Sequence, residues 1–158
     1  MQSQSPEDSQ NCAVCASLRE RRPGSKPVFE NDLWIVRPAP APCGVVGWMM
    51  LIARRHVAGP AHFNDREANN FGLALRHFEK VLEEVTGALR IYTVAMGESS
   101  PHFHAHLVPR YKTMPKGASG WSVFDLERAA RVGEIAVDEA EVDRLAEAYR
   151  RALEERAN

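Results

Sequence analysis

Residues Pro101–Arg110, PHFHAHLVPR, are the stretch that decides the fold of this chain. They contain three histidines two residues apart, His102, His104 and His106, with apolar residues between them. Successive side chains of a β-strand point to opposite faces of the sheet, so residues two apart share one face. The spacing therefore predicts a strand over Phe103–Val108 that directs its imidazoles to one side and its apolar side chains into a core.

Three imidazoles on one face indicate a chemical role. Imidazole has the side-chain pKa nearest to neutral pH, which suits nucleophilic work, acid–base work or metal binding. Three of the chain's six histidines in alternation are hard to explain as ordinary surface residues. A His-x-His pair also occurs in metal enzymes, where carboxylate ligands usually lie nearby. The nearest carboxylate here is Glu98, so the residues alone leave a nucleophilic site and a metal site open.

The composition is that of one soluble globular domain. The chain has 158 residues, of which 44% are hydrophobic and 26% charged, and its formal net charge is −1. This balance argues against the basic field that nucleic-acid binding needs. The apolar run Val45–Ala53 is too short for a membrane span, which needs about 20 residues. The N-terminus shows no signal pattern, so we expect a cytoplasmic protein. From the charge balance and the short apolar run, we expect it to bind neither nucleic acid nor membranes.

The apolar patterns predict an α+β fold with about five antiparallel strands, one long central helix and a C-terminal helix. Strands are predicted over residues 28–30, 33–36, 45–53, 89–96 and 103–108, and helices over residues 64–86 and 138–154. Asn64 or Asp65 is expected to cap the long helix, and Asp138 with Glu141 forms the pattern of a capping box. Residues 111–133 show no firm period and are predicted to be a long surface insertion.

Three parts of the chain follow from these patterns. Residues 1–10 are polar and are predicted to be a disordered tail. Residues 11–110 form the domain that carries the histidines. Residues 111–158 form a C-terminal extension, an insertion followed by a helix, that packs on this domain.

A C-x-x-C pair lies near the N-terminus, at Cys12 and Cys15. With three cysteines and no secretion signal, a disulfide framework is not expected. The spacing fits a zinc site, a redox pair or a chance occurrence. A redox pair usually lies between a strand and a helix, whereas Cys12 follows a polar tail. Cys43 stands in a proline-rich turn and is expected to be a bystander.

The sequence around the histidines resembles the histidine triad family. HFHAHLV fits the motif His-φ-His-φ-His-φ-φ, where φ is apolar, and the Pro-Arg that follows is frequent in that family. Gly97-Glu98-Ser99 stands where members typically carry Gly-Gln-Ser or Gly-Gln-Thr, and Leu51–Val57 resembles their strand that ends in a basic pair and a histidine. The likeness covers roughly residues 10–110 and implies a histidine-triad-like fold. The ending HLVPR resembles the diadenosine polyphosphate hydrolase branch.

The resemblance implies a nucleotide hydrolase that acts through a covalent histidine intermediate. His104, the middle histidine, would attack the α-phosphate of a dinucleoside polyphosphate or a nucleoside phosphoramidate, with its other ring N–H held by a backbone carbonyl. His106 would hydrogen-bond a phosphate oxygen or the leaving group. Ser99 and Glu98 occupy the substrate-binding positions, and Glu98 replaces the usual Gln with a carboxylate that repels phosphate unless it is protonated or turned away.

The resemblance also implies a structural zinc and a homodimer. The zinc ligands carried over from the family are Cys12, Cys15, His56 and His102, and catalysis itself needs no cofactor. Two thiolates and two imidazoles make a closed tetrahedral site of the structural type. This site would leave His102 unavailable for chemistry.

Two rival functions stay open from the sequence. A non-catalytic nucleotide-binding module would bind AMP without turnover, and Glu98 favours it. A metallohydrolase would use the three histidines on one catalytic metal ion.

Several further residues have both a functional and a structural interpretation. Arg54 and Arg55 can attract a polyphosphate or simply form a solvated strand end. The three tryptophans can stack a base, although core packing is the better interpretation of Trp34. Asn31 and Asp32 are weak candidates for binding a ribose.

Overall fold

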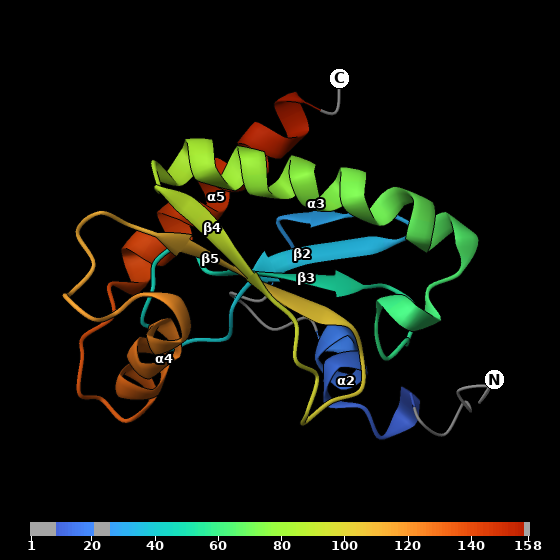
Figure 1. Ribbon diagram of the computed structural model, residues 1–158, viewed down its shortest axis with the longest axis horizontal. Helices are drawn as coiled ribbons and strands as arrows, with labels where there is room; N and C mark the ends of the chain where they lie inside the picture. The colour runs from blue at the N-terminus through green and yellow to red at the C-terminus, as the bar shows by residue number, and fades with distance from the viewer. Residues whose placement is uncertain (1–8, 21–25, 157–158) are drawn as a thin grey trace.

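The computed structural model describes residues 9–20 and 26–156 and has the predicted α+β architecture (Figure 1). Five strands form one antiparallel sheet in the order β1-β2-β3-β5-β4. The strands are β1 (Phe29–Glu30), β2 (Trp34–Pro38), β3 (Met49–Ala53), β4 (Arg90–Val94) and β5 (His104–Arg110). The helices are α2 (Ala13–Arg19), α3 (Asp65–Thr86), α4 (Val123–Arg131) and α5 (Glu139–Glu155), with short 3-10 turns η1 (Pro60–His62) and η2 (Gly120–Ser122). The disordered tail predicted for residues 1–10 falls mainly outside the described residues.

Helices cover both faces of the sheet (Figure 1). The long helix α3 and the C-terminal helix α5 lie on one face, where they enclose the main core with side chains of β2, β3 and β5. Helix α2 packs on the other face against Ile35, Met50 and Ile52. Helix α4 lies beside the sheet on this second side and packs against Trp48 and Val108.

The register of β5 places its histidines on the second face. His104 lies opposite Ile52 and His106 opposite Met50, while Ala105 and Leu107 are buried in the core under α3. This is the alternation that the sequence predicts. The ladder begins at His104, not at the expected Phe103.

Backbone hydrogen bonds of Phe103 keep His102 in place, although His102 lies outside the hydrogen-bond ladder between β3 and β5. The Phe103 N–H donates to the Val57 carbonyl at 2.6 Å, and the Phe103 carbonyl accepts from the Ala53 N–H at 3.1 Å. These bonds continue the chain's path beyond the end of β5. They hold the backbone of His102 against the end of β3.

The strand expected over residues 45–53 is shorter than predicted. Residues 45–48 form a turn in which the Trp48 N–H donates to the Val45 carbonyl at 3.2 Å. Gly47 has a φ of +82°, a left-handed conformation that side chains disfavour and that ends the extended run. Val45 and Trp48 of this turn are nevertheless buried and Val46 is half-buried, which is why the sequence pattern looked continuous.

The second half of the surface insertion expected over residues 111–133 contains a helix that the sequence pattern did not indicate. Residues 123–131 form α4, with Val123 fully buried and Ala130 at 5% exposure. A nine-residue helix offers too few turns for a clear apolar period, and Gly117 and Gly120 just before it favoured a loop.

The caps of the two long helices follow the sequence closely. Asn64 and Glu67 form a reciprocal capping box at the start of α3. Asp138 accepts a bond from the Glu141 N–H at 3.0 Å, but the Glu141 carboxylate pairs with Arg144 instead of completing the box.

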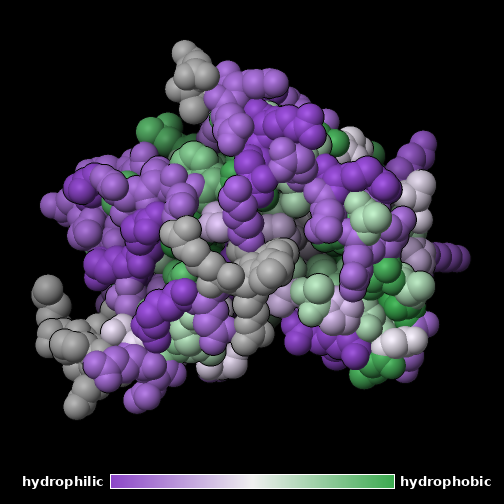
Figure 2. All heavy atoms as spheres, turned by 180° about the vertical axis from the view of Figure 1, so that it is seen from behind, coloured by the Kyte–Doolittle hydropathy of each residue, from purple (hydrophilic) through white to green (hydrophobic). Residues whose placement is uncertain are grey.

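The surface is mainly hydrophilic when seen from behind, and hydrophobic side chains gather on the side where α4 lies (Figure 2). No helix among the described residues combines the length and the apolar character that a membrane span requires.

The packing of α5 on α3 generates a stability prediction. Leu153 is 2% exposed in the main core, so Leu153→Ala should lower the free energy of unfolding by about 2–5 kcal/mol through lost burial and a residual cavity. Leu89, which is 55% exposed, provides a matched control, and Leu89→Ala should change stability by less than about 0.5 kcal/mol. Urea unfolding of both variants measures the difference, and equal effects would contradict this packing.

Candidate functional site

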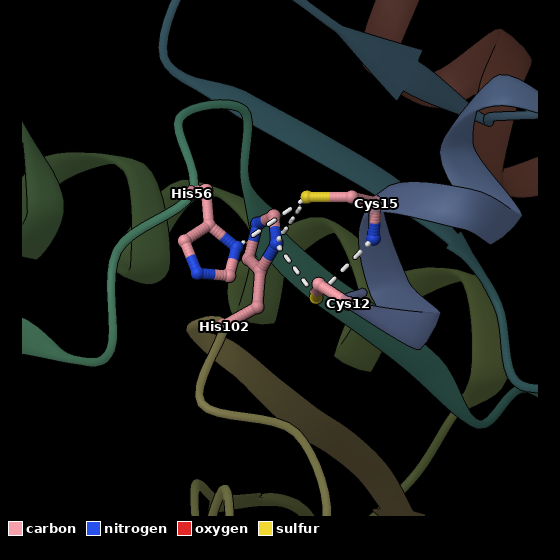
Figure 3. Close-up of side chains that lie close together, drawn as sticks. All are labelled: Cys12, Cys15, His56 and His102. Atoms are coloured by element: carbon pink, nitrogen blue, oxygen red, sulfur yellow. Dashed lines mark hydrogen bonds between the residues drawn. The ribbon is translucent and has the colours of Figure 1, made fainter. Parts of the chain in front are cut away.

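Four thiol and imidazole side chains from distant parts of the chain meet beside β3 (Figure 3). Cys12 caps the N-terminus of α2, and Cys15 lies in its first turn. His56 follows β3, and His102 precedes β5. The four candidate ligand atoms all lie within 4.8 Å of one another, so the structure brings together the complete predicted metal set.

The spacing of the donor atoms suits a metal ion with tetrahedral coordination. The Cys15 Sγ lies 3.4 Å from His56 Nδ1 and 3.2 Å from His102 Nδ1, and the Cys12 Sγ lies 3.7 Å from His102 Nδ1. Bonds of about 2.3 Å to sulfur and about 2.0 Å to nitrogen put neighbouring donors of a tetrahedron about 3.3–3.8 Å apart. The residues therefore fit a zinc ion with four protein ligands and no open position.

Hydrogen bonding orients His102 toward the thiols. Its ring is fully buried, and Nε2 lies 2.7 Å from the Ala53 carbonyl oxygen. A carbonyl only accepts, so Nε2 carries the proton and Nδ1 presents its lone pair to Cys12 and Cys15. Burial lowers the pKa of His102, which favours this neutral form.

The pKa of the Cys15 thiol argues against a reactive redox pair. Burial, followed by the neighbouring Cys12, raises the pKa of the Cys15 thiol to about 11. Redox-active C-x-x-C motifs instead have lowered thiol pKa values. Neither cysteine forms a disulfide in the described part of the chain. A bound cation would favour the thiolate form, which burial disfavours.

His104 is held by the backbone of its neighbour. Its Nδ1 lies 2.8 Å from the His102 carbonyl oxygen. Because this carbonyl only accepts, Nδ1 donates and Nε2 keeps its lone pair. The half-buried ring thus has the tautomer that a nucleophilic imidazole requires.

His106 has the opposite arrangement. The indole Nε1–H of Trp48 donates to His106 Nδ1 at 3.0 Å. Phe124 of α4 packs edge-on against both rings, at centroid distances of 5.7 Å from His106 and 5.2 Å from Trp48. Burial, followed by the charge on His104 when protonated, lowers the pKa of His106, which favours the neutral ring.

The two expected substrate-binding residues lie in the loop between β4 and β5. Glu98 and Ser99 are both exposed. Within the described part of the chain, neither side chain forms a hydrogen bond or ion pair. They precede the histidine strand in sequence, and among the described residues no hydrogen bond joins either of them to His104.

The basic pair after β3 serves the fold. Arg54 pairs with Glu30 at 2.9 Å, and Arg55 forms two bonds, of 2.9 and 2.7 Å, to the buried carboxylate of Glu67 in the α3 capping box. The hydrogen bond to Glu67 raises the pKa of Arg55. Both guanidinium groups are therefore engaged in structural contacts.

The remaining candidates separate into core and surface residues. Trp34 is fully buried and donates to Asn70 Oδ1 at 2.7 Å, as the core interpretation predicts. Asn31 accepts two backbone bonds within its own turn, and Asp32 is exposed. Trp121 is 72% exposed beside α4.

Three residues that contact the histidine strand or α2 were not evident from the sequence. Trp48 and Phe124 surround His106, although they come from parts of the chain 76 residues apart, and no local pattern indicates that they meet. Arg37 is 8% exposed and donates to Ser17 Oγ at 2.8 Å, which attaches α2 to β2. A charged residue at the end of a short strand gave no sign of this burial.

Several solved structures of similar fold bear histidine triad names. A zinc-bound histidine triad family protein from Mycobacterium smegmatis superposes with a TM-score of 0.66 over 94% of this chain and 99% of its own, at 15% identity. A Hit-like protein involved in cell-cycle regulation from Bartonella henselae gives 0.65 over 90% and 96%, at 16% identity. A hypothetical histidine triad nucleotide-binding protein from Sulfolobus tokodaii gives 0.66 over 91% and 93%, at 14% identity.

Comparisons by sequence add nothing to this likeness. No family model matches the chain, and no curated protein matches it. At identities of 14–16% the structural likeness extends to the fold and not to the activity of these proteins. The sheet order, the long helix and the near-complete coverage of both chains establish that this protein has the histidine triad fold.

Proposed function

We propose that the protein is a nucleotide hydrolase of the histidine triad type, with His104 as its nucleophile. The observation that carries the proposal is the bond between His104 Nδ1 and the His102 carbonyl, which leaves the Nε2 lone pair available. The Sulfolobus tokodaii protein of the same fold is named as nucleotide-binding, which supports a nucleotide as substrate.

The reaction has two steps. In the first, the His104 Nε2 lone pair forms a bond to the α-phosphorus, and the bond from phosphorus to the leaving group breaks with its electron pair. In the second, water attacks phosphorus, the P–N bond breaks and Nε2 recovers its lone pair. One water proton passes to the solvent, and the nucleoside monophosphate is released.

The substrate class follows from this chemistry. Attack at the α-phosphate needs a leaving group that departs as a polyphosphate or an amine, so dinucleoside polyphosphates and nucleoside phosphoramidates are both candidates. We favour the polyphosphates because the HLVPR ending resembles the diadenosine polyphosphate hydrolases. Ser99 is proposed to bind the phosphate. Glu98, its neighbour in the same loop, is proposed to influence the choice of leaving group through its carboxylate.

We further propose that Cys12, Cys15, His56 and His102 hold a structural zinc ion. Their donor spacing fits a tetrahedral ion, and the Mycobacterium smegmatis protein of this fold is described as zinc-bound. Zinc in such a closed site supplies folding stability and no open position for substrate. These four side chains would tie α2 to the segment after β3 and to His102, two residues before His104. The homodimer and the cytoplasmic location remain predictions.

The geometry does not favour the metallohydrolase. A shared catalytic ion needs the three histidines to converge, whereas His102 directs Nδ1 to the thiols and His104 directs Nδ1 to a backbone carbonyl. His106 Nδ1 accepts from an indole. The nucleotide-binding module differs from the hydrolase only in turnover, and the assay below distinguishes them.

The nucleophile is tested by turnover. Purified protein should release AMP from diadenosine tetraphosphate, diadenosine triphosphate or AMP-lysine phosphoramidate, and His104→Ala should lower kcat by at least about a thousandfold because the covalent step is lost. His62→Ala, at an exposed histidine, is the matched control and should retain activity. Circular dichroism establishes that both variants fold.

The outcomes separate the three functions. Release that survives brief chelation and is lost in His104→Ala supports the hydrolase. Rapid, reversible loss on chelation would favour the metallohydrolase. If the protein binds AMP but produces no AMP from any of these substrates, the nucleotide-binding module is favoured. Glu98→Gln would then be the variant to assay.

The zinc site is tested by metal content. The purified protein should contain one zinc per chain, and Cys15→Ser should lose it and unfold at lower temperature, because a tetrahedral site missing one thiolate binds far more weakly. Cys43→Ser should keep its zinc, since Cys43 lies in a separate cluster against α4. Equal zinc content in the two variants, measured by atomic emission, would disprove the assignment.

A further inference from the structure

The tryptophan that precedes β3 makes a specific contact with the last of the three histidines. Trp48 is 3% exposed, and its Nε1 lies 3.0 Å from His106 Nδ1. An indole N–H can donate a hydrogen bond but cannot accept one. His106 Nδ1 must therefore be the acceptor, and the neutral ring carries its proton on Nε2.

This arrangement makes neighbouring histidines complementary. His104 has its proton on Nδ1 and a bare Nε2, whereas His106 has a bare Nδ1 and its proton on Nε2. The two rings lie 5.6 Å apart between centroids. One therefore offers an electron pair and the other offers a proton on the same face of the sheet.

The proton on His106 Nε2 is available to a ligand. Among the described residues, the only buried side-chain polar atoms without a hydrogen-bond partner are Nε of Arg37 and Nε of Arg150. His106 Nε2 has no protein partner in that part of the chain either, so it is not sealed from solvent. The ring is thus fixed through Nδ1 and exposed through Nε2.

Two parts of the chain hold the indole in place. The Trp48 carbonyl accepts from the Ala39 N–H at 2.9 Å, and the Trp48 N–H donates to the Val45 carbonyl at 3.2 Å. Phe124 of α4 closes the other side of the indole and of the imidazole. The donor is rigid, because both its backbone and its ring are restrained.

We propose that Trp48 is a positioning residue that holds His106 as a neutral Nε2–H donor to the leaving group. The inference rests on the hydrolase function proposed above. As His104 Nε2 bonds to phosphorus and the leaving oxygen takes the electron pair of the broken bond, His106 Nε2–H donates a hydrogen bond to that oxygen. An amine leaving group would take its proton from solvent and depart as the neutral amine, while His106 Nε2–H would donate a hydrogen bond and keep its proton, because loss of that proton would leave an imidazolate anion.

The tautomer is tested without any substrate. In protein labelled with 15N on histidine, His106 should show an unprotonated Nδ1 and a protonated Nε2. In Trp48→Phe, which keeps a ring but removes the N–H, both resonances should move toward values averaged over two tautomers. Trp121→Phe, the same exchange at an exposed indole, should leave them in place. A protonated Nδ1 in the parent protein would overturn the proposal.

A double-mutant cycle tests the role in turnover. Trp48→Phe should lower kcat about tenfold and leave KM within about twofold, since a hydrogen bond made in the transition state is weakened. The loss should be larger with an amine leaving group than with p-nitrophenol, which needs no donor. In a His106→Ala background, Trp48→Phe should cause no further loss, because its effect passes through His106.

The outcomes remain distinct from those of the proposed function. Additive losses in the cycle, or an equal loss with both leaving groups, would mean that Trp48 only supports the fold and would overturn the proposal. Absence of turnover in the parent protein would overturn the hydrolase, while the 15N spectra would still decide whether Trp48 sets the tautomer of His106.

Discussion

The hydrogen bond from His104 Nδ1 to the His102 carbonyl is the contact on which the site depends. Through this bond, His102 contributes to two sites. The ring of His102 belongs to the cluster of thiols and imidazoles, and its carbonyl sets the tautomer of the proposed nucleophile. The fixed backbone around Phe103 joins the two roles, because it prevents the carbonyl from turning away. Any ion that immobilises the His102 ring therefore also immobilises the acceptor of His104.

The fold could largely be predicted because its signals are local. The alternation over residues 103–108, the long apolar stripe of α3 and the Asn64 cap each act within one element, where strand and helix periods apply. The errors came where tertiary contacts decide. The turn at Gly47 keeps Val45 and Trp48 buried although it is not a strand, and α4 is too short to show a period.

The candidate site divides in the same way. The metal set was implied by resemblance residue by residue, and the structure brings those four side chains together. The surroundings of His106 could not be predicted, because Trp48 and Phe124 meet it only through folding. The partners of Arg54 and Arg55 were equally hidden, since Glu30 and Glu67 lie in other elements.

Because α4 contributes to it, the candidate site is built from two separate segments of the chain. The surroundings of His104 come from the segment that leads into β5, whereas one wall beside His106 comes from residues after the sheet is complete. Changes in the length or composition of residues 111–133 would therefore reshape the surroundings of His106, the proposed donor to the leaving group, and leave His104, the proposed nucleophile, as it is. Substrate range could diverge among chains of this fold through that segment alone, with the histidine strand unaltered.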